Sequence, residues 1–304
     1  MSGFIRSKDI YLEMCSKSTL LHRMTDEERE QLQAHLRKMY IDVEKVCDRH
    51  GLKMMIAFGS VLGAVRHKGF IPWDDDMDLL MPRDDYDKLV HLYADELPEK
   101  YKLYAPNSKN GAISRFCKIV DTTTRFLTPG TDENNEETGI FLDIFPLENA
   151  PTGKWSIKIR MYWSYLLMYV AGSVDQYEHP SDFVKQLMSG SKDARSNYRF
   201  RNFVGWLFSF SSTQSWYNRI DRFTRWNKQT GYYCWPVGPA SAKSFMPRPK
   251  AVFFPVSRGK FDDIEVYLPA DPIRFCEMQY GDWQKLPPPE ERWQHFIKDI
   301  KFSL

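Results

Sequence analysis

The chain has 304 residues, of which 42% are hydrophobic, and this length suits one large domain or two small ones. Its formal net charge of only +2 gives no bulk electrostatic attraction for nucleic acid, which argues against a nucleic-acid-binding protein. Five scattered cysteines with no paired spacing exclude a zinc ribbon and favour a reducing compartment over a disulfide framework.

The N-terminal segment, residues 1–14, alternates polar and apolar side chains and lacks the continuous apolar core of a signal peptide. No window of the sequence approaches the roughly 18 apolar residues that a membrane span requires. We therefore expect a cytoplasmic protein, located at most at the inner face of the membrane.

An amphipathic helix is expected to begin after Thr25. Thr25 and Glu28 have the spacing of a capping box, and Gly51 is a natural stop at the other end. Between them, apolar residues recur at intervals of three and four: Leu32, Leu36, Met39, Val43 and Val46. This stripe is typical of a helix that packs against a core.

A short buried strand is expected over residues 53–58, ending at Gly59 and Ser60. A glycine and a hydroxyl residue after a strand let a phosphate approach backbone N–H groups, particularly where a helix begins. Residues 60–65 are compatible with such a helix. Taken alone the pair indicates only a turn, so its significance comes from its place shortly before an acidic run.

That run is the most informative feature of the sequence, with four carboxylates among residues 74–78 followed by apolar residues. Asp76 and Asp78 are two apart on an expected strand over residues 76–81, so they should project from the same face. Two neighbouring carboxylates repel each other unless a cation lies between them, and Mg²⁺ (or Mn²⁺) is the usual ion. A solvated acidic turn is the alternative, which the apolar flanks disfavour.

A helix is expected from Pro82 to about residue 97, followed by strands over residues 102–104 and 115–120. Residues 139–147 then form an apolar strand that contains a single carboxylate, Asp143. A charge buried in such a strand needs compensation. A metal ion, a basic side chain and a shift in pKa all remain possible at this point.

The zone of residues 153–235 is rich in aromatic side chains, with 20 in 83 residues. Residues 153–225 carry 11 basic against 5 acidic side chains, whereas residues 72–148 carry 8 against 17. Helices are expected over residues 155–170 and 198–210. Their aromatic faces should pack on the core as a helical insertion, with contact to lipid or a lipid-linked substrate as the alternative.

The C-terminal zone is expected to contain strands over residues 252–255 and 264–269, separated by a turn at residues 257–260. A short helix should cover residues 271–278. Rigid turns are expected at residues 280–283 and 287–292. His295 is expected to be a capped surface histidine, or part of a closing lid.

Several of these segments together resemble the LicD family of phosphotransferases, which is related to the fukutin-like proteins and belongs to the nucleotidyltransferase superfamily. The segments are Gly59-Ser60, residues 62–67, residues 71–78, residues 142–147 and the Tyr-Gly-Asp and Pro-Pro-Pro turns. The match runs from about residue 41 to residue 295 with a poorly matching middle.

The resemblance implies an α+β fold, a nucleotidyltransferase-like mixed β-sheet flanked by helices, with a helical insertion. It implies one domain over residues 1–304. Within it, residues 25–150 would form the nucleotidyltransferase-like core and residues 151–235 the aromatic, basic insertion. Residues 236–304 would supply strands and turns that complete the domain.

The resemblance also implies an active site. Asp76, Asp78 and Asp143 would bind Mg²⁺ (or Mn²⁺) and act as the catalytic carboxylates, with Asp143 orienting or deprotonating the acceptor hydroxyl. Asp74 and Asp75 would shape the loop or bind metal through water.

The donor phosphates would be held at a second group of residues. Gly59 and Ser60 would bind a phosphate of an activated nucleotide donor, and further candidates for this role are Arg66, His67 and Lys118.

The implied reaction transfers a phospho-alcohol group, such as phosphocholine, from a CDP-activated donor to a sugar hydroxyl of a surface glycan or a lipid-linked glycan precursor. Lipopolysaccharide or teichoic acid would be the modified polymer. A nucleotidyltransferase that transfers a nucleoside monophosphate and releases pyrophosphate is one alternative. A non-catalytic glycan-binding subunit is the other, but it would be expected to lack one of the three carboxylates.

Overall fold

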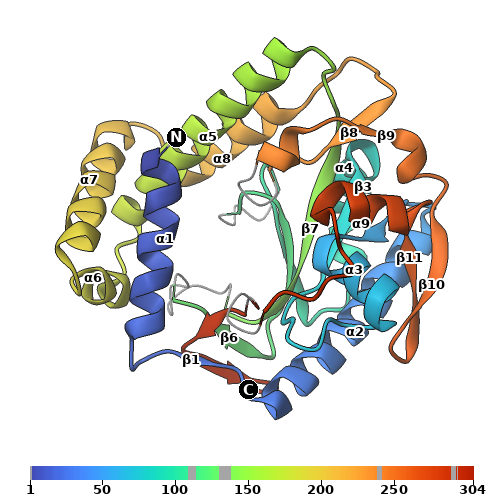
Figure 1. Ribbon diagram of the computed structural model, residues 1–304, viewed down its shortest axis with the longest axis horizontal. Coiled ribbons are helices and arrows are strands. Elements are labelled where there is room, and N and C mark those ends of the chain that lie inside the picture. Colours follow the sequence, from blue (N-terminus) through green and yellow to red (C-terminus); the bar gives the residue numbers. More distant parts are fainter. Residues whose placement is uncertain (1, 109–113, 130–137, 238–241, 289–291, 293) are drawn as a thin grey trace.

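A mixed β-sheet forms the centre of the fold (Figure 1). Neighbouring strands follow the order β2 (Met55–Ile56), β3 (Asp78–Pro82), β7 (Ile140–Asn149), β5 (Cys117–Asp121) and β4 (Tyr101–Tyr104). Strands β3 and β7 are parallel, whereas the other neighbours in this order are antiparallel. The computed structural model describes residues 2–108, 114–129, 138–237, 242–288, 292 and 294–304. The expected mixed sheet with flanking helices is confirmed, while the nucleotidyltransferase-like assignment stays a prediction.

The expected N-terminal helix is α2 (Asp26–Arg49), and Thr25 and Glu28 form both hydrogen bonds of the capping box. All five residues of the predicted apolar stripe are buried on it. A second helix, α1 (Ser2–Lys17), precedes it and was not predicted, because its alternating polar and apolar residues give a weak helical period.

Two short helices follow β2 and β3 directly. Helix α3 (Phe58–His67) begins two residues after β2, so the strand is shorter than expected and Gly59 and Ser60 lie in the first turn of a helix. Helix α4 (Arg83–Leu92) follows β3 as predicted but ends early, and a 3₁₀ turn, η1 (Ala94–Glu96), continues it.

The aromatic zone consists of four helices, α5 (Lys154–Glu178), α6 (Asp182–Met188), α7 (Lys192–Phe208) and α8 (Thr213–Thr224). Helices α6 and α8 were not predicted. Helix α7 begins earlier than expected because the Ser191 side chain caps it by accepting a hydrogen bond from the Ala194 N–H. Among the described helices of the chain, none is both long and apolar enough to cross a membrane.

The aromatic faces of these helices pack only in part. Helix α5 buries Val170, Ala171 and Val174 against Trp216 and Ile220 of α8, in a cluster separate from the main core. Many of the remaining aromatic side chains of α5 and α7 are exposed. The expectation that both aromatic faces pack on the core is therefore wrong for much of their area.

The C-terminal hairpin differs from the predicted one. Strands β10 (Ser257–Phe261) and β11 (Ile264–Leu268) pair from Ser257 opposite Leu268, so the predicted turn at residues 257–260 is a strand. The turn instead contains Asp262, which has a φ of +54°. Phe253, in the segment expected to be a strand, is buried in the core beside Trp235 and Phe275, after the 3₁₀ turn η3 (Lys250–Val252).

The remaining elements join the two ends of the chain to the core. Helix α9 (Pro272–Tyr280) confirms the predicted short helix, whereas residues 289–291 and 293 of the Pro-rich turn region lie outside the described residues. Near the C-terminus, β12 (Phe296–Ile297) pairs with β1 (His22–Arg23), and β13 (Asp299–Lys301) pairs with β6 (Arg125–Leu127). Strand β8 (Tyr232–Cys234) pairs with both β7 and β9 (Arg248–Pro249). The 3₁₀ turn η2 (Ala242–Phe245) lies between β8 and β9.

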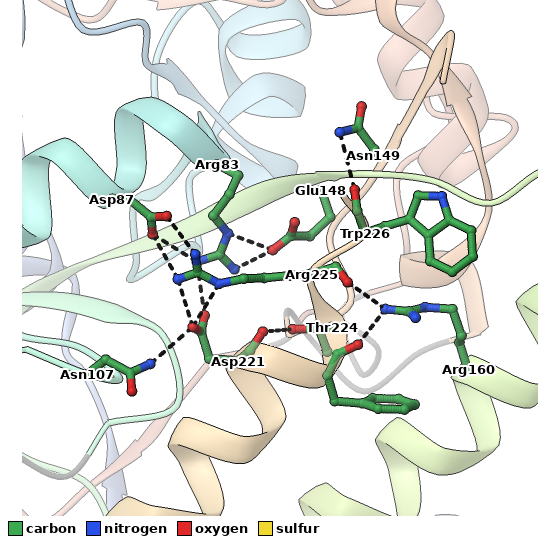
Figure 2. A network of polar contacts seen from close by, with 11 residues as sticks. Arg83, Asp87, Asn107, Glu148, Asn149, Arg160, Asp221, Thr224, Arg225 and Trp226 are labelled. Carbon is green, nitrogen blue, oxygen red and sulfur yellow. Dashed lines mark hydrogen bonds and ion pairs between the residues drawn. The ribbon is translucent and has the colours of Figure 1, made fainter. Parts of the chain in front are cut away.

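A network of ion pairs joins α8 to the sheet (Figure 2). The buried carboxylate of Glu148 on β7 accepts a hydrogen bond from Arg83 Nε at 2.7 Å, and Asp221 Oδ1 on α8 lies 2.9 Å from Arg83 NH1. Arg225 joins Asp221 to Asp87 at 3.0 and 2.8 Å. The network therefore connects helix α8 by ion pairs to β7, the strand that carries Asp143.

We expect Glu148→Gln to lower the free energy of unfolding by roughly 2–4 kcal/mol, because it removes the most deeply buried charged partner of Arg83 and leaves Asp221 and Asp87 to balance the guanidinium. Asp87→Asn, in the same network but more exposed, should cost at most about 1 kcal/mol. Urea denaturation of both variants measures the difference. Equal losses in the two variants would contradict the assigned importance of the buried pair.

Candidate active site

The parallel pairing of β3 and β7 places two carboxylates side by side, because Asp78 and Asp143 are register partners. Asp76 lies two residues before Asp78, in the segment that leads into β3, so the strand begins two residues later than the expected range of 76–81. Met77 between them is buried, whereas Asp76 and Asp78 are partly exposed. This alternation places Asp76 and Asp78 on the same side of the backbone, as the spacing predicts.

The electrostatic consequence of this grouping is a rise in the pKa of each carboxyl group. Burial is the main cause that raises the pKa of Asp76 to about 6. The negative charges of Asp75 and Asp143 raise this pKa further, whereas the positive charge of His295 lowers it. Burial, together with repulsion from Asp76 and Asp143, raises the pKa of Asp78 well above its usual value. Burial also raises the pKa of Asp143, against the attraction of Lys118. The group therefore lacks positive charge.

The donor atoms of this group fit a hard divalent cation. Asp143 Oδ1 is buried and has no hydrogen-bond partner among the described residues, and the nearest cationic atom in an ion pair with it, Lys118 Nζ, is 3.6 Å away. An orphaned carboxylate oxygen beside two further carboxylates is the ligand chemistry that Mg²⁺ prefers. Metal binding by Asp76, Asp78 and Asp143 stays a prediction, which the orphaned Asp143 oxygen supports.

A second grouping overlaps the first. Ligand atoms of Asp75, Asp76 and His295 lie within 4.8 Å of one another, a spacing that also allows a metal. However, both carboxylate oxygens of Asp75 already contact His295. The backbone N–H of His295 donates a hydrogen bond to Asp75 Oδ2 at 2.7 Å, and its ring Nδ1 lies 2.8 Å from Asp75 Oδ1. Burial lowers the pKa of His295, but the hydrogen bond and charge of Asp75 outweigh it and raise the pKa to about 9. A protonated imidazole is a poor ligand, so His295 acts here as a cation.

Sequence reasoning missed this role of His295. It was expected at the surface or in a lid, yet it holds the C-terminal segment onto the acidic run through Asp75. Asp75 is buried and uses both oxygens for this contact, which is more than the loop-shaping role expected of it. No spacing in the sequence links positions 75 and 295, so only the fold reveals the pair.

Gly59 and Ser60 lie beside the carboxylates, in the first turn of α3. The Asp78 N–H donates a hydrogen bond to Ser60 Oγ at 3.2 Å, so this hydroxyl positions the strand residue. A side chain at position 59 would approach Asp74 Oδ2 to 2.7 Å, which explains the glycine. Phe58, just before it, adopts a φ of +42°, a left-handed conformation that is strained for a bulky residue and is typical of functional turns.

The other candidates for binding donor phosphates are more dispersed. Lys118 is the register partner of Asp143 and pairs with it. Arg66 and His67 lie at the far end of α3, roughly 10 Å along the helix axis from Gly59. Arg66 donates hydrogen bonds to His67 Nε2 at 2.9 Å and to the Trp283 carbonyl at 2.8 Å. Among the described residues, no hydrogen bond or ion pair joins Arg66 or His67 to the acidic run.

Arg115, immediately before β5, is a cation near the site that sequence reasoning did not single out. Its Nε is buried without a hydrogen-bond partner among the described residues, and its NH1 donates only to Met168 Sδ at 3.8 Å. Burial lowers its pKa, and the charge of Asp143 is near enough to oppose this shift. An arginine with unused donors beside a carboxylate group is suited to bind an anionic ligand.

Comparison with known proteins finds a family model that matches the part of the chain around these residues. Residues 51–191 match the family model described as LicD/FKTN/FKRP, nucleotidyltransferase domain. The matched range contains the acidic run, Asp143 and the first turn of α3, whereas His295 lies outside it. The resemblance seen in the sequence is thereby confirmed.

Individual relatives agree with this match. The lipopolysaccharide cholinephosphotransferase LicD of Haemophilus influenzae is 26% identical over 255 residues, which cover 84% of this chain and 90% of the relative. Two uncharacterized Rickettsia proteins match shorter stretches. RT0683 of Rickettsia typhi is 36% identical over 25% of this chain and 23% of its own length, and RP689 of Rickettsia prowazekii is 39% identical over 17% and 18%.

We expect Asp78→Asn to keep or raise the melting temperature without metal, because it removes one repelling charge. The same variant should lose the rise in melting temperature that Mg²⁺ gives the parent protein, because one ligand is gone. Thermal unfolding with increasing Mg²⁺ measures both effects.

The matched control is Asp84→Asn, which removes an exposed carboxylate in the first turn of α4. It should respond to Mg²⁺ as the parent does. A full Mg²⁺ response in Asp78→Asn would rule out Asp78 as a ligand.

Proposed function

Because the chain carries a LicD-family domain, we propose that it is a metal-dependent transferase of phospho-alcohol groups. It moves a group such as phosphocholine from a CDP-activated donor to a sugar hydroxyl of a surface glycan or glycolipid precursor. The observation that carries this proposal is the in-register placement of Asp78 and Asp143, next to Asp76 and the first turn of α3.

The carboxylates divide the chemistry between them. Asp76 and Asp78 would hold Mg²⁺ (or Mn²⁺), with Asp143 as the third carboxylate of the group. When bound, the ion neutralises charge on the donor phosphates and on the leaving nucleotide. Asp143, the register partner of Asp78, is also the carboxylate proposed to take the proton of the acceptor hydroxyl.

The reaction balances without a further reactant. The acceptor hydroxyl oxygen attacks the phosphorus that carries the alcohol, and its proton passes to the Asp143 carboxylate. The bond from that phosphorus to the bridging oxygen breaks, so CMP leaves and a new phosphodiester forms on the sugar. Phosphoryl-type transfer depends mainly on positioning and charge neutralisation, which is what these residues supply.

The donor phosphates have three groups of partners in this proposal. Backbone N–H groups at Gly59 and Ser60 lie in the first turn of α3, at the positive end of the helix dipole, which favours a phosphate there. Lys118 and Arg115 add cationic charge next to Asp143. Arg66 and His67 stay as candidates for a more distant part of the donor, because they lie at the other end of α3.

A nucleotidyltransferase reaction is the second candidate, favoured by the description of the matching family domain. The same carboxylates would serve, but the nucleoside monophosphate would reach the acceptor and pyrophosphate would leave. Because pyrophosphate leaves only from a nucleoside triphosphate, the assay compares CTP labelled in the cytidine with a CDP-alcohol labelled separately in the cytidine and in the alcohol. The first reaction carries only the alcohol label into the product, and cytidine label in the product would overturn it.

We expect Asp143→Asn to lower kcat by about a hundredfold to ten-thousandfold, because the amide cannot accept the proton of the acceptor. Turnover of CDP-choline with Mg²⁺ and a glycan acceptor measures the loss. Asp84→Asn is the control and should keep the parent rate. If Asp143→Asn stays folded and retains full Mg²⁺-dependent turnover, the assigned mechanism fails.

A further inference from the structure

Helices α5 and α7 present an exposed apolar face that the proposed chemistry does not use. On α5, Trp155, Ile159, Tyr162 and Leu166 follow one another at intervals of three and four, and each is at least 44% exposed. This spacing places them on one stripe of the helix. Further along α5, Val170 and Val174 are buried against α8, so the exposed stripe belongs to the N-terminal part of the helix.

Helix α7 carries a matching stripe at its C-terminal end. Phe203 and Trp206 are 55% and 57% exposed, and Phe210, just past the helix, is 74% exposed. Helices α6 and α7 lie on the side of the molecule away from the sheet (Figure 1). Their exposed aromatic side chains are therefore remote from the candidate active site.

A groove lies between α5 and α7, and Leu166 is the one residue of the two stripes that lines it. Trp163 and Leu166 of α5 and Phe200 of α7 line it and are also exposed at the surface. The groove has a volume of about 750 Å³ and a largely apolar lining. We call the two stripes and the exposed residues of this groove the α5–α7 face. Exposed apolar surfaces of this kind on a soluble chain mark interaction sites.

Basic side chains lie on both stripes. On α7, Lys192, Arg195 and Arg199 are exposed and precede Phe203 at intervals of three and four, so they continue the same stripe. On α5, exposed Lys158 lies within the stripe, with its Nζ 5.6 Å from the Trp155 ring centre. The α5–α7 face therefore combines large apolar side chains with positive charge.

We propose that the α5–α7 face docks on the surface of a bilayer that contains anionic phospholipids. Aromatic side chains enter the boundary between headgroups and acyl chains, while lysine and arginine contact the phosphates, which is the pattern of interfacial helices. Two partners could cover such a face, a second copy of this chain or a bilayer, and the charge of the face favours the bilayer. A second copy of this chain would oppose one basic face with another, whereas an anionic bilayer is complementary to it.

The proposal does not depend on the assigned reaction, and vesicle flotation with the full chain tests it. The chain should float with vesicles that contain phosphatidylglycerol and remain behind with vesicles of pure phosphatidylcholine. Added salt should weaken the binding, because it screens the charged contacts. Asp143→Asn should bind as the parent does, so failure of the transfer mechanism and failure of this proposal are distinguishable.

Two double variants locate the contact. Phe203→Ser with Trp206→Ser should weaken binding to the anionic vesicles about tenfold or more. Arg195→Gln with Arg199→Gln should weaken it by roughly fivefold for each charge removed.

Matched controls remove similar side chains elsewhere. Leu92→Ser with Ile273→Ser removes two exposed apolar residues, and Lys38→Gln with Lys45→Gln removes two exposed charges. Both controls should bind vesicles like the parent.

Three results would overturn the proposal. The parent chain could fail to float with anionic vesicles, or the α5–α7 variants could float as well as the controls. The third is a parent that forms a dimer in solution by light scattering without binding vesicles, while Phe203→Ser with Trp206→Ser is monomeric. That outcome would assign the face to a second copy of the chain.

Discussion

The structure depends on the parallel, in-register pairing of β3 with β7, which brings Asp78 next to Asp143 from 65 residues away along the chain. A shift of one residue in this register would turn one of the two side chains to the opposite face of the sheet. The neighbours of the pair follow from the same alignment. Strand β5 places Lys118 opposite Asp143, and the α3 turn reaches the Asp78 backbone through Ser60.

This alignment is electrostatically unfavourable without added positive charge. Partly buried carboxylates in close proximity raise one another's pKa values, and each such rise disfavours the ionised form. The protein supplies a limited compensation through Lys118 at 3.6 Å and through His295, which Asp75 holds in its charged form. The remaining deficit of positive charge is what a divalent ion and the donor-binding cations would supply. The same carboxylates therefore destabilise the folded protein by repelling one another and supply the ligands that the proposed function needs.

The sequence predicted the parts of this site that have local signals. The capping box and periodic stripe of α2, and the alternation of Asp76 and Asp78, are short-range patterns with direct physical meaning. The pairing of Asp78 with Asp143 came only through resemblance to a family, because register between distant strands has no local signal. The division of the chain into core, insertion and C-terminal part stays a prediction.

Other features could not be predicted because they depend on tertiary contacts. The apolar segment at Phe253 reads as a strand in isolation, but burial against Trp235 decides its conformation. The bond between Asp75 and His295, and the unused donors of Arg115, arise from segments that meet only in the fold.

A crystal structure of the protein with Mn²⁺ and a CDP-alcohol tests the central claim most directly, because manganese can be located by its anomalous scattering. The account predicts an anomalous peak that places a manganese ion within bonding distance of oxygens of Asp76, Asp78 and Asp143. A donor phosphate should face the first turn of α3. A peak bonded instead to Asp75, Asp76 and His295, or a donor bound with no metal at the carboxylates, would contradict it.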